Sequence, residues 1–187
     1  MSVTRMTIDG YGQVEINNCA FRRDGRIEAQ CAPDTVDFAT IKVENGMLLN
    51  VDNVARKVSL PTDSALPIAL TYSAEHLYDE RALGLKDFAL NGSDDFYPRL
   101  GYLAVGDKYT TNCIGWDSAV DTAWADESAF VSALESYATT PLYAGIAAEG
   151  CHLISASAPT VGPVLRVVEY TTMPDGQPAV KLQVYSC

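Results

Sequence analysis

The sequence predicts a mainly β protein: a small antiparallel β-barrel or sandwich with one or two short helices and an extended N-terminal arm. Short segments rich in apolar and β-forming residues recur along the chain, and turn residues such as Gly, Pro, Asn and Asp separate them. Alternating strand and helix patterns, which would indicate a parallel sheet, are absent. At 187 residues, the chain is expected to form one β-rich domain over residues 1–187, with residues 1–30 as an arm or an edge hairpin.

The N-terminal half contains a series of short expected strands. They span residues 3–8, 13–16, 40–43, 47–51, 55–60 and 68–72. The dipeptide Asn45-Gly46 lies between two apolar runs, and this arrangement is the strongest short-range signal for a β-hairpin. We therefore expect the segments on either side of it to pair with each other.

Residues 96–112 predict a second hairpin, which is crowded with aromatic side chains. Leu100 and Tyr102 fall on one face of an extended chain, and Gly106 and Asp107 supply a turn. The chain then resumes with β-forming residues.

The C-terminal third returns to strands after a helix. The helix is expected over residues 126–138, where Phe130 and Leu134 recur at helical spacing. Asp126 can cap its first turn. A second segment, residues 73–83, has high helix propensity but dense charge, so a short helix and an ordered loop both remain open.

Strands are expected after the helix at residues 142–147, 153–157, 164–170 and 179–185. The Pro-Asp-Gly turn at 174–176 makes the last two strands the clearest hairpin in the chain.

The charge balance argues against nucleic acid and anionic membranes as partners. Thirteen Lys and Arg against 24 Asp and Glu leave a formal net charge of −11, which repels phosphate groups. The longest apolar runs are far shorter than the ~20 residues of a transmembrane helix. The first ten residues lack the apolar stretch of a secretory signal.

The cysteines form an odd set without a C-x-x-C spacing. They are Cys19, Cys31, Cys113, Cys151 and Cys187. This pattern favours reduced and mostly buried thiols in a protein made in a cytosol. It argues against a disulfide framework and against a structural zinc site.

No catalytic motif is present, and the densest titratable cluster is a weak signal. Glu75, His76 and Asp79 could hold a metal ion in a small metal-dependent hydrolase, but the H-E-x-x-H pattern is missing. A solvated, ion-paired segment is the simpler interpretation. Asp94 and Asp95 likewise favour a polar turn over a calcium site. We expect no enzyme activity, no catalytic or metal-binding residue and no cofactor.

Cys151 and His152 are neighbours in sequence, which makes them a second place to look for catalysis. In an extended strand their side chains point to opposite faces, so they are not expected to act together. A spatial pairing of Cys113 with either histidine, His76 or His152, is left open.

Partner-binding residues are expected among the aromatic and basic side chains. The candidates are Tyr97, Tyr102, Tyr109, Trp116 and Trp124, together with the basic cluster Arg22, Arg23 and Arg26. Aromatic side chains make good anchors at interfaces, and Trp116 and Trp124, which flank residues 117–121, are the preferred exposed pair. The alternatives are that the aromatic residues fill the core and that the arginines form a solvated turn.

Several segments of the chain resemble structural proteins of tailed bacteriophages, of the kind encoded beside the major capsid protein. The segments are VENGMLLNVD (43–52), YSAE (72–75), YDER (78–81), KDF (86–88) and YPRLGYLAVGD (97–107). The resemblance runs from about residue 7 to the C-terminus.

The resemblance implies a non-enzymatic virion protein, synthesised in the bacterial cytoplasm and located on the capsid surface. Such a decoration or cement protein would bind the outer surface of the major capsid protein lattice, stabilise the head and contact neighbouring copies of itself. The alternatives are a tail or baseplate component and a host-binding adhesin, in which the loop between Trp116 and Trp124 contacts carbohydrate or a receptor. In the decoration hypothesis, residues 2–16 are the arm expected to become ordered on the partner.

Overall fold

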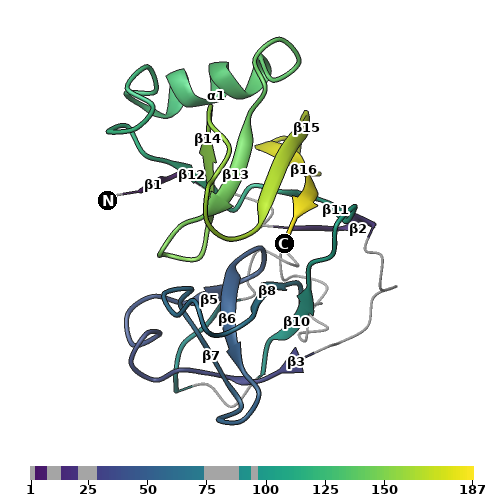
Figure 1. Cartoon of the computed structure of the whole chain (residues 1–187). Coiled ribbons are helices and arrows are strands. Elements are labelled where there is room, and N and C mark those ends of the chain that lie inside the picture. Colours follow the sequence, from purple (N-terminus) through teal and green to yellow (C-terminus); the bar gives the residue numbers. More distant parts are fainter. Residues whose placement is uncertain (1–2, 8–13, 21–28, 74–88, 94–96) are drawn as a thin grey trace.

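The fold is mainly β, which confirms the predicted class. The structure is a computed structural model that describes residues 3–7, 14–20, 29–73, 89–93 and 97–187. In these ranges it contains one helix, α1 (Glu127–Glu135), and three sheets of eight, six and two strands. The largest sheet and α1 form the upper part of the molecule in Figure 1, and the six-stranded sheet forms the lower part. Within these ranges no helix has the length and apolar character needed to cross a membrane.

The eight-stranded sheet is built from both ends of the chain. Its order is β1 (Thr4–Arg5), β12 (Ile114–Trp116), β14 (His152–Ser155), β13 (Tyr143–Ile146), β15 (Val164–Thr172), β16 (Pro178–Ser186), β11 (Lys108–Thr111) and β2 (Glu15–Ala20). Neighbouring strands are antiparallel except β12 and β14, which run parallel. Strands β1 and β2 both fall within residues 1–30, the segment expected to form an arm or an edge hairpin. They lie at opposite edges of the sheet, where β1 pairs with β12 and β2 pairs with β11.

The six-stranded sheet uses the middle of the chain. Its order is β3 (Ala29–Gln30), β10 (Arg99–Tyr102), β8 (Ile68–Thr71), β6 (Leu48–Asp52), β7 (Lys57–Ser59) and β4 (Ala32–Pro33). Only the β4 and β7 pair in this sheet is parallel. The third sheet pairs β5 (Val43–Glu44) with β9 (Ala89–Leu90).

Strand β6 is central to the packing because both of its faces are buried. Leu48 and Leu49 are adjacent, so their side chains point to opposite faces, and neither is exposed to solvent. Leu48 packs in the cluster that includes Ile154 of the large sheet, whereas Leu49 packs in a second cluster with Val58. A strand covered on both sides requires a continuous apolar run, and Met47–Leu49 supplies it.

The two larger sheets meet where β6 contacts the turn between β13 and β14. The Leu48 N–H donates a hydrogen bond of 2.8 Å to the carbonyl oxygen of Gly150. Gly150 has a φ of +84°, and a Cβ there would lie 2.9 Å from Cε of Met47. Both the backbone conformation and the close packing therefore favour glycine at this contact.

The last hairpin and the helix are confirmed. Strands β15 and β16 pair over nearly their whole length, and Gly176 takes a φ of +90° in the turn between them. Helix α1 begins after Asp126, whose side chain accepts a hydrogen bond from the Ala129 N–H. Phe130 and Leu134 are fully buried on its inner face. The second expected helix falls mostly on residues 74–88, which lie outside the described ranges.

The predicted hairpin at 96–112 is wrong in its pairing. The turn forms, because Gly106 takes a φ of +99° and the Asp107 carboxylate accepts a 2.7 Å hydrogen bond from the Ala104 N–H. Strand β10, however, pairs with β3 and β8, whereas β11 pairs with β16 and β2. The Gly106 N–H donates to the Val184 carbonyl oxygen in β16, so this turn carries the chain from one sheet to the other.

The predicted hairpin around Asn45-Gly46 is also wrong in its pairing. Gly46 has the positive φ of a turn, +83°. The Gly46 N–H and the Asn45 side chain, however, donate to the carbonyl oxygens of Thr71 and Ser73, which directs the chain into the β8 side of the six-stranded sheet. Strand β5 pairs instead with β9.

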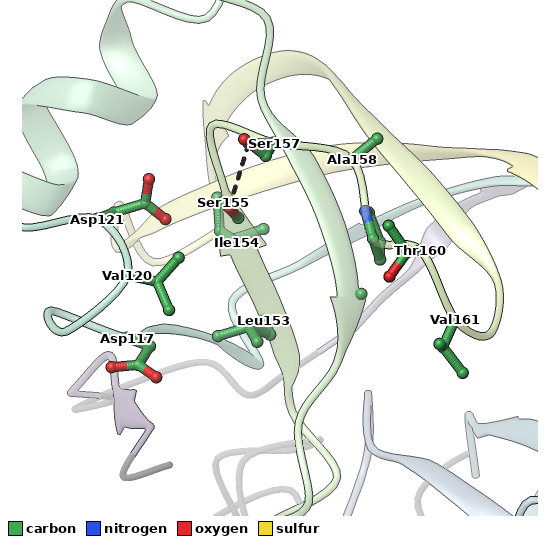
Figure 2. Close-up of a pocket in the computed structure, with 12 residues that line it drawn as sticks. Asp117, Val120, Asp121, Leu153, Ile154, Ser155, Ser157, Ala158, Thr160 and Val161 are labelled. Atoms are coloured by element: carbon green, nitrogen blue, oxygen red, sulfur yellow. Dashed lines mark hydrogen bonds between the residues drawn. The ribbon is translucent and has the colours of Figure 1, made fainter.

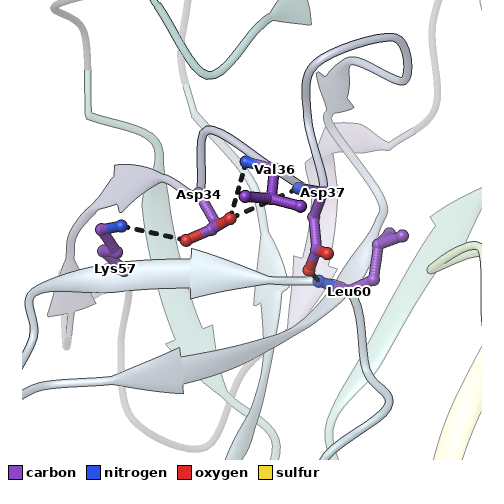
Figure 3. A network of polar contacts seen from close by, with 5 residues as sticks. All are labelled: Asp34, Val36, Asp37, Lys57 and Leu60. Atoms are coloured by element: carbon purple, nitrogen blue, oxygen red, sulfur yellow. Dashed lines mark hydrogen bonds and ion pairs between the residues drawn. The ribbon is translucent and has the colours of Figure 1, made fainter.

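A polar network fastens the segment after β4 to β7 (Figure 3). One oxygen of the Asp34 carboxylate accepts from the N–H groups of Val36 and Asp37, and the other lies 3.0 Å from Nζ of Lys57. Asp37 in turn accepts from the Leu60 N–H at 2.8 Å. The hydrogen bond from Val36 and the bond to Lys57 hold the pKa of Asp34 below its usual value.

An ion pair joins the edge of the large sheet to the two-stranded sheet. A guanidinium nitrogen of Arg5, in β1, lies 2.6 Å from a carboxylate oxygen of Glu44, in β5. The two side chains keep only 33% and 25% of their exposure, and Nε of Arg5 is enclosed without a hydrogen-bond partner. The pair is therefore partly desolvated, which makes the loss of one member costly.

We expect Arg5→Met to lower the free energy of unfolding by about 2 kcal/mol, because the Glu44 charge then stays partly buried and unpaired. The double variant Arg5→Met/Glu44→Met is expected to be more stable than the sum of the single effects predicts. Urea unfolding of the four proteins measures the coupling. Lys57→Met, which breaks the more exposed pair with Asp34, is the matched control and should cost less than about 1 kcal/mol. Additive single effects at Arg5 and Glu44 would contradict the prediction.

Candidate functional site

Trp116 and Trp124 are buried, so the expectation that they form an exposed contact pair is wrong. Their exposed fractions are 3% and 7%. The ring of Trp116 stacks on Phe130 of α1 with 4.5 Å between ring centroids, and Trp124 contacts the same ring at 5.6 Å. The apolar face of α1 needs a cover, and these two side chains supply it.

The same tryptophans close a surface loop, residues 117–123. Nε1–H of Trp116 donates a 2.7 Å hydrogen bond to the carbonyl oxygen of Trp124. Inside the loop, the Asp117 carbonyl oxygen accepts from the N–H groups of Val120 and Asp121, which forms a single helical turn. The aromatic pair thus positions the loop from the inside of the protein.

Tyr109 is also buried, and it cannot contact a partner in this conformation. Its hydroxyl lies 2.6 Å from Nε2 of His152, and Nδ1 of His152 lies 3.0 Å from the Cys113 carbonyl oxygen. Burial lowers the pKa of His152 to about 4. The imidazole is therefore neutral, so Nδ1–H donates to the carbonyl and Nε2 accepts from the tyrosine. The His152 ring is thus held between the Tyr109 hydroxyl and the backbone carbonyl of Cys113. Tyr109 and His152 therefore form a structural polar pair inside the core.

Two of the expected aromatic contacts reach the surface. Tyr97 is 44% exposed, and Tyr102 is half-buried, with its hydroxyl accepting a 3.0 Å hydrogen bond from the side chain of Asn53. The basic cluster Arg22, Arg23 and Arg26 lies outside the described residues, so its role stays a prediction.

A cleft of about 400 Å³ lies between two loops that flank strands β13 and β14 of the large sheet (Figure 2). Gly145 of β13 and Leu153 and Ser155 of β14 form its floor. The other lining residues are Asp117, Val120, Asp121, Ile154, Ser157, Ala158, Pro159, Thr160 and Val161. One wall is thus the loop closed by the two tryptophans.

Two carboxylates on that wall, Asp117 and Asp121, form no ion pair with any Lys or Arg in the described ranges. One oxygen of Asp117 accepts from the Ala119 N–H at 2.9 Å, and one oxygen of Asp121 accepts from the Ala156 N–H at 3.4 Å. The second oxygen of each is enclosed and has no hydrogen-bond partner among the residues that the structure describes. In the described part of the chain, the ion pairs of Lys and Arg are made with other carboxylates.

The rim and the opposite wall of the cleft are largely apolar. Val120 and Val161 are 58% and 83% exposed and lie on opposite sides of the cleft. Pro159 packs directly on the floor, where a Cβ at Gly145 would lie 3.1 Å from Cγ of the proline. The arrangement can hold a ligand that presents an apolar surface, because the exposed valines and the proline offer an apolar lining.

The described residues contain no further candidate for a metal site or for a reactive thiol. In these ranges no group of three or more His, Cys, Asp and Glu side chains could hold a metal ion. The hydrolase hypothesis on Glu75, His76 and Asp79 lies outside them, as do Asp94 and Asp95.

The cysteines that the structure describes in the core are kept unreactive by burial. Cys31, Cys113 and Cys151 are buried, and none of them forms a disulfide within the described residues. Burial raises the pKa of Cys113 to about 11 and that of Cys151 to about 12, so both are protonated and unreactive at neutral pH. They behave as small core residues, as expected for that part of the set.

Comparison with protein-family models, with curated proteins and with solved structures finds no match to this chain.

No sequence pattern predicts the cleft. Its two loops are distant in sequence, and neither carries a motif. The one available signal is the polar segment 117–121 between Trp116 and Trp124, for which the sequence predicts a loop with the tryptophans as its exposed contact residues. The acidic and apolar side chains of that region, Asp117, Val120 and Asp121, are the ones that line the cleft.

Proposed function

We propose that the protein is a non-enzymatic structural protein of a tailed-bacteriophage virion, which decorates the head by binding the outer surface of the major capsid protein lattice. The resemblance in residues 43–52 and 97–107 supports the class of protein. The observation that carries the binding role is the cleft with exposed Val120 and Val161 at its rim, because exposed apolar side chains around a hollow are typical of protein-binding surfaces.

A binding surface as small as this cleft is sufficient for attachment to a repeating capsid shell. Many copies of one capsid protein present the same contact side by side, and contacts between neighbouring copies of the decoration protein add to each single interaction. The net charge of −11 keeps free copies apart through repulsion and disfavours contact with the packaged nucleic acid. A binding surface for protein is therefore a better fit than one for phosphate.

The experiment is sedimentation of the purified protein with empty, undecorated heads of its phage at two salt concentrations. We expect saturable binding at a fixed copy number per capsomer. Val161→Asp is expected to weaken binding at least ten-fold, because it places a charge in an apolar contact. Val54→Asp is the matched control, since Val54 is 97% exposed in the turn between β6 and β7, away from the cleft.

Two outcomes would overturn the proposal. One is the absence of binding to heads together with recovery of the protein on purified tails, which would favour the tail or adhesin alternative. The other is equal loss of binding in both valine variants, which would separate head binding from the cleft.

A further inference from the structure

We propose that one face of the large sheet binds an acidic segment of a protein partner, whose carboxylates pair with Arg166 of β15 and Lys108 of β11. We call this surface, which spans β13, β15, β16 and β11, the basic face. The inference rests on the proposed function in one respect only, namely that the natural source of the carboxylates is another protein.

Four side chains of the basic face form one row across neighbouring strands (Figure 1). Arg166 lies between Tyr143 of β13 and Gln183 of β16, and Gln183 lies opposite Lys108. Residues that lie directly opposite each other on antiparallel strands share a face of the sheet. The row points away from the core, because the residues on either side of Arg166 and of Gln183 are buried in the main core cluster, whereas the row itself is half-buried or exposed.

The basic face carries positive charge in a protein that is acidic overall. Its four strands contain three basic residues, Lys108, Arg166 and Lys181, and one acidic residue, Glu169. Lys181 pairs with Glu169 at 2.7 Å, so that carboxylate is already neutralised. In the described ranges, neither Arg166 nor Lys108 forms an ion pair. Because the net charge of −11 repels an acidic partner from the protein as a whole, the surplus of positive charge directs such a partner to this face.

Arg166 is held in a geometry that suits a carboxylate. The central carbon of its guanidinium group lies over the ring of Tyr185, 5.9 Å from the ring centroid, and Tyr185 is 50% exposed. The ring attracts the cation and limits the orientations that the side chain adopts. The N–H donors of a guanidinium lie in its plane, where a carboxylate accepts two parallel hydrogen bonds.

The spacing of the two cations defines what the partner must present. Arg166 and Lys108 lie two strands apart with Gln183 between them, which corresponds to about 10 Å at the usual spacing of strands. A protein segment with two acidic side chains at this separation engages both cations, and the amide of Gln183 can donate to an oxygen between them. A nucleic acid carries a charge on every nucleotide, so most of its phosphates would face the acidic remainder of the protein. A segment with a few carboxylates is therefore the better match.

Fluorescence anisotropy of a labelled octaglutamate peptide tests the assignment on the full-length protein. We expect saturable binding at low salt that weakens as the salt concentration rises, because exposed charges are screened. A glycine–serine peptide of the same length and with the same label should give no saturable signal. Octathymidylate with the same label is expected to bind at least ten-fold more weakly than octaglutamate.

Substitutions at the two cations identify the surface. Arg166→Gln is expected to weaken octaglutamate binding about ten-fold, because it removes charge-assisted hydrogen bonds. Lys108→Gln removes a more exposed point charge, so we expect a loss of about three-fold. Arg166→Lys keeps the charge without the planar fork and should bind with an affinity between those of the wild type and Arg166→Gln.

Arg99→Gln is the matched control, because Arg99 is an exposed arginine of β10 in the six-stranded sheet, and this variant should bind as the wild type does. Circular dichroism establishes that each variant is folded, and Lys108→Gln alone suffices if Arg166→Gln is not.

Three results would overturn the inference. They are the absence of saturable octaglutamate binding, binding of octathymidylate as tight as that of octaglutamate, and an effect of Arg166→Gln no larger than that of Arg99→Gln. Any of them leaves head binding to be judged by the sedimentation experiment with Val161→Asp, so that failure of the basic face and failure of the decoration function are distinguishable.

Discussion

Trp116→Ala is expected to lower the free energy of unfolding by about 4 kcal/mol, which is typical for loss of a large aromatic side chain from a core. The substitution removes the ring that stacks on Phe130 and the hydrogen bond to the Trp124 carbonyl oxygen. For a chain of this size, the change corresponds to a decrease of roughly 10 °C in Tm. Thermal unfolding followed by circular dichroism measures it.

Two further variants make the test specific to burial. Trp116→Phe keeps a ring against Phe130 and loses only the hydrogen bond and part of the area, so we expect a smaller cost of about 1–2 kcal/mol. Val54→Ala, at a side chain that is 97% exposed, should change stability by less than about 0.5 kcal/mol. A Trp116→Ala protein as stable as the wild type would mean that the ring is a surface contact after all.

The second large effect is a loss of stability in acid that arises from His152. Its pKa is about 4 in the folded protein against 6.5 ordinarily, because burial disfavours the imidazolium. As the pH falls below about 6.5, the unfolded chain binds a proton that the folded protein does not. The unfolded state is thereby favoured, and at pH 4 the buried His152 lowers the free energy of unfolding by about 3 kcal/mol relative to neutral pH.

The comparison of variants isolates this histidine from the carboxylates that also titrate. His152→Asn removes the titrating group and keeps a donor for the Cys113 carbonyl oxygen, so stability should decrease less steeply between pH 7 and pH 4 than in the wild type. Tyr109→Phe is the control, because it removes the hydrogen bond to Nε2 but leaves the buried imidazole in place. Parallel pH profiles for the wild type and His152→Asn, measured by urea unfolding, would refute the assignment.

Local structure was predictable from this sequence, whereas strand partners were predictable only for the hairpin of β15 and β16, whose strands are joined by a short turn. Helix α1 follows from the spacing of Phe130 and Leu134 and from the cap at Asp126, all of which lie within a few residues of each other. The turns at Gly46 and Gly106 were likewise correctly located. Their strands pair elsewhere because contacts with distant segments, such as Gly106 with Val184, decide the direction in which the chain leaves the turn.

The same limit applies to the candidate site. Tryptophan is suited both to a core and to an interface, so sequence alone does not distinguish the two locations. Trp116 and Trp124 are buried because α1 packs on them, and that placement depends on the completed sheet. The cleft depends on the same sheet, since β13 and β14 form its floor and two separate loops form its walls.

The topology of the large sheet has a consequence for how the chain folds during synthesis. Strands β1 and β2 leave the ribosome first, but their partners β12 and β11 follow only after the whole six-stranded sheet has been translated. The pairing of β11 with β16 then waits for the C-terminal hairpin. Because most contacts in this sheet are distant in sequence, we expect slow folding, with the N-terminal strands exposed to other chains until translation is complete.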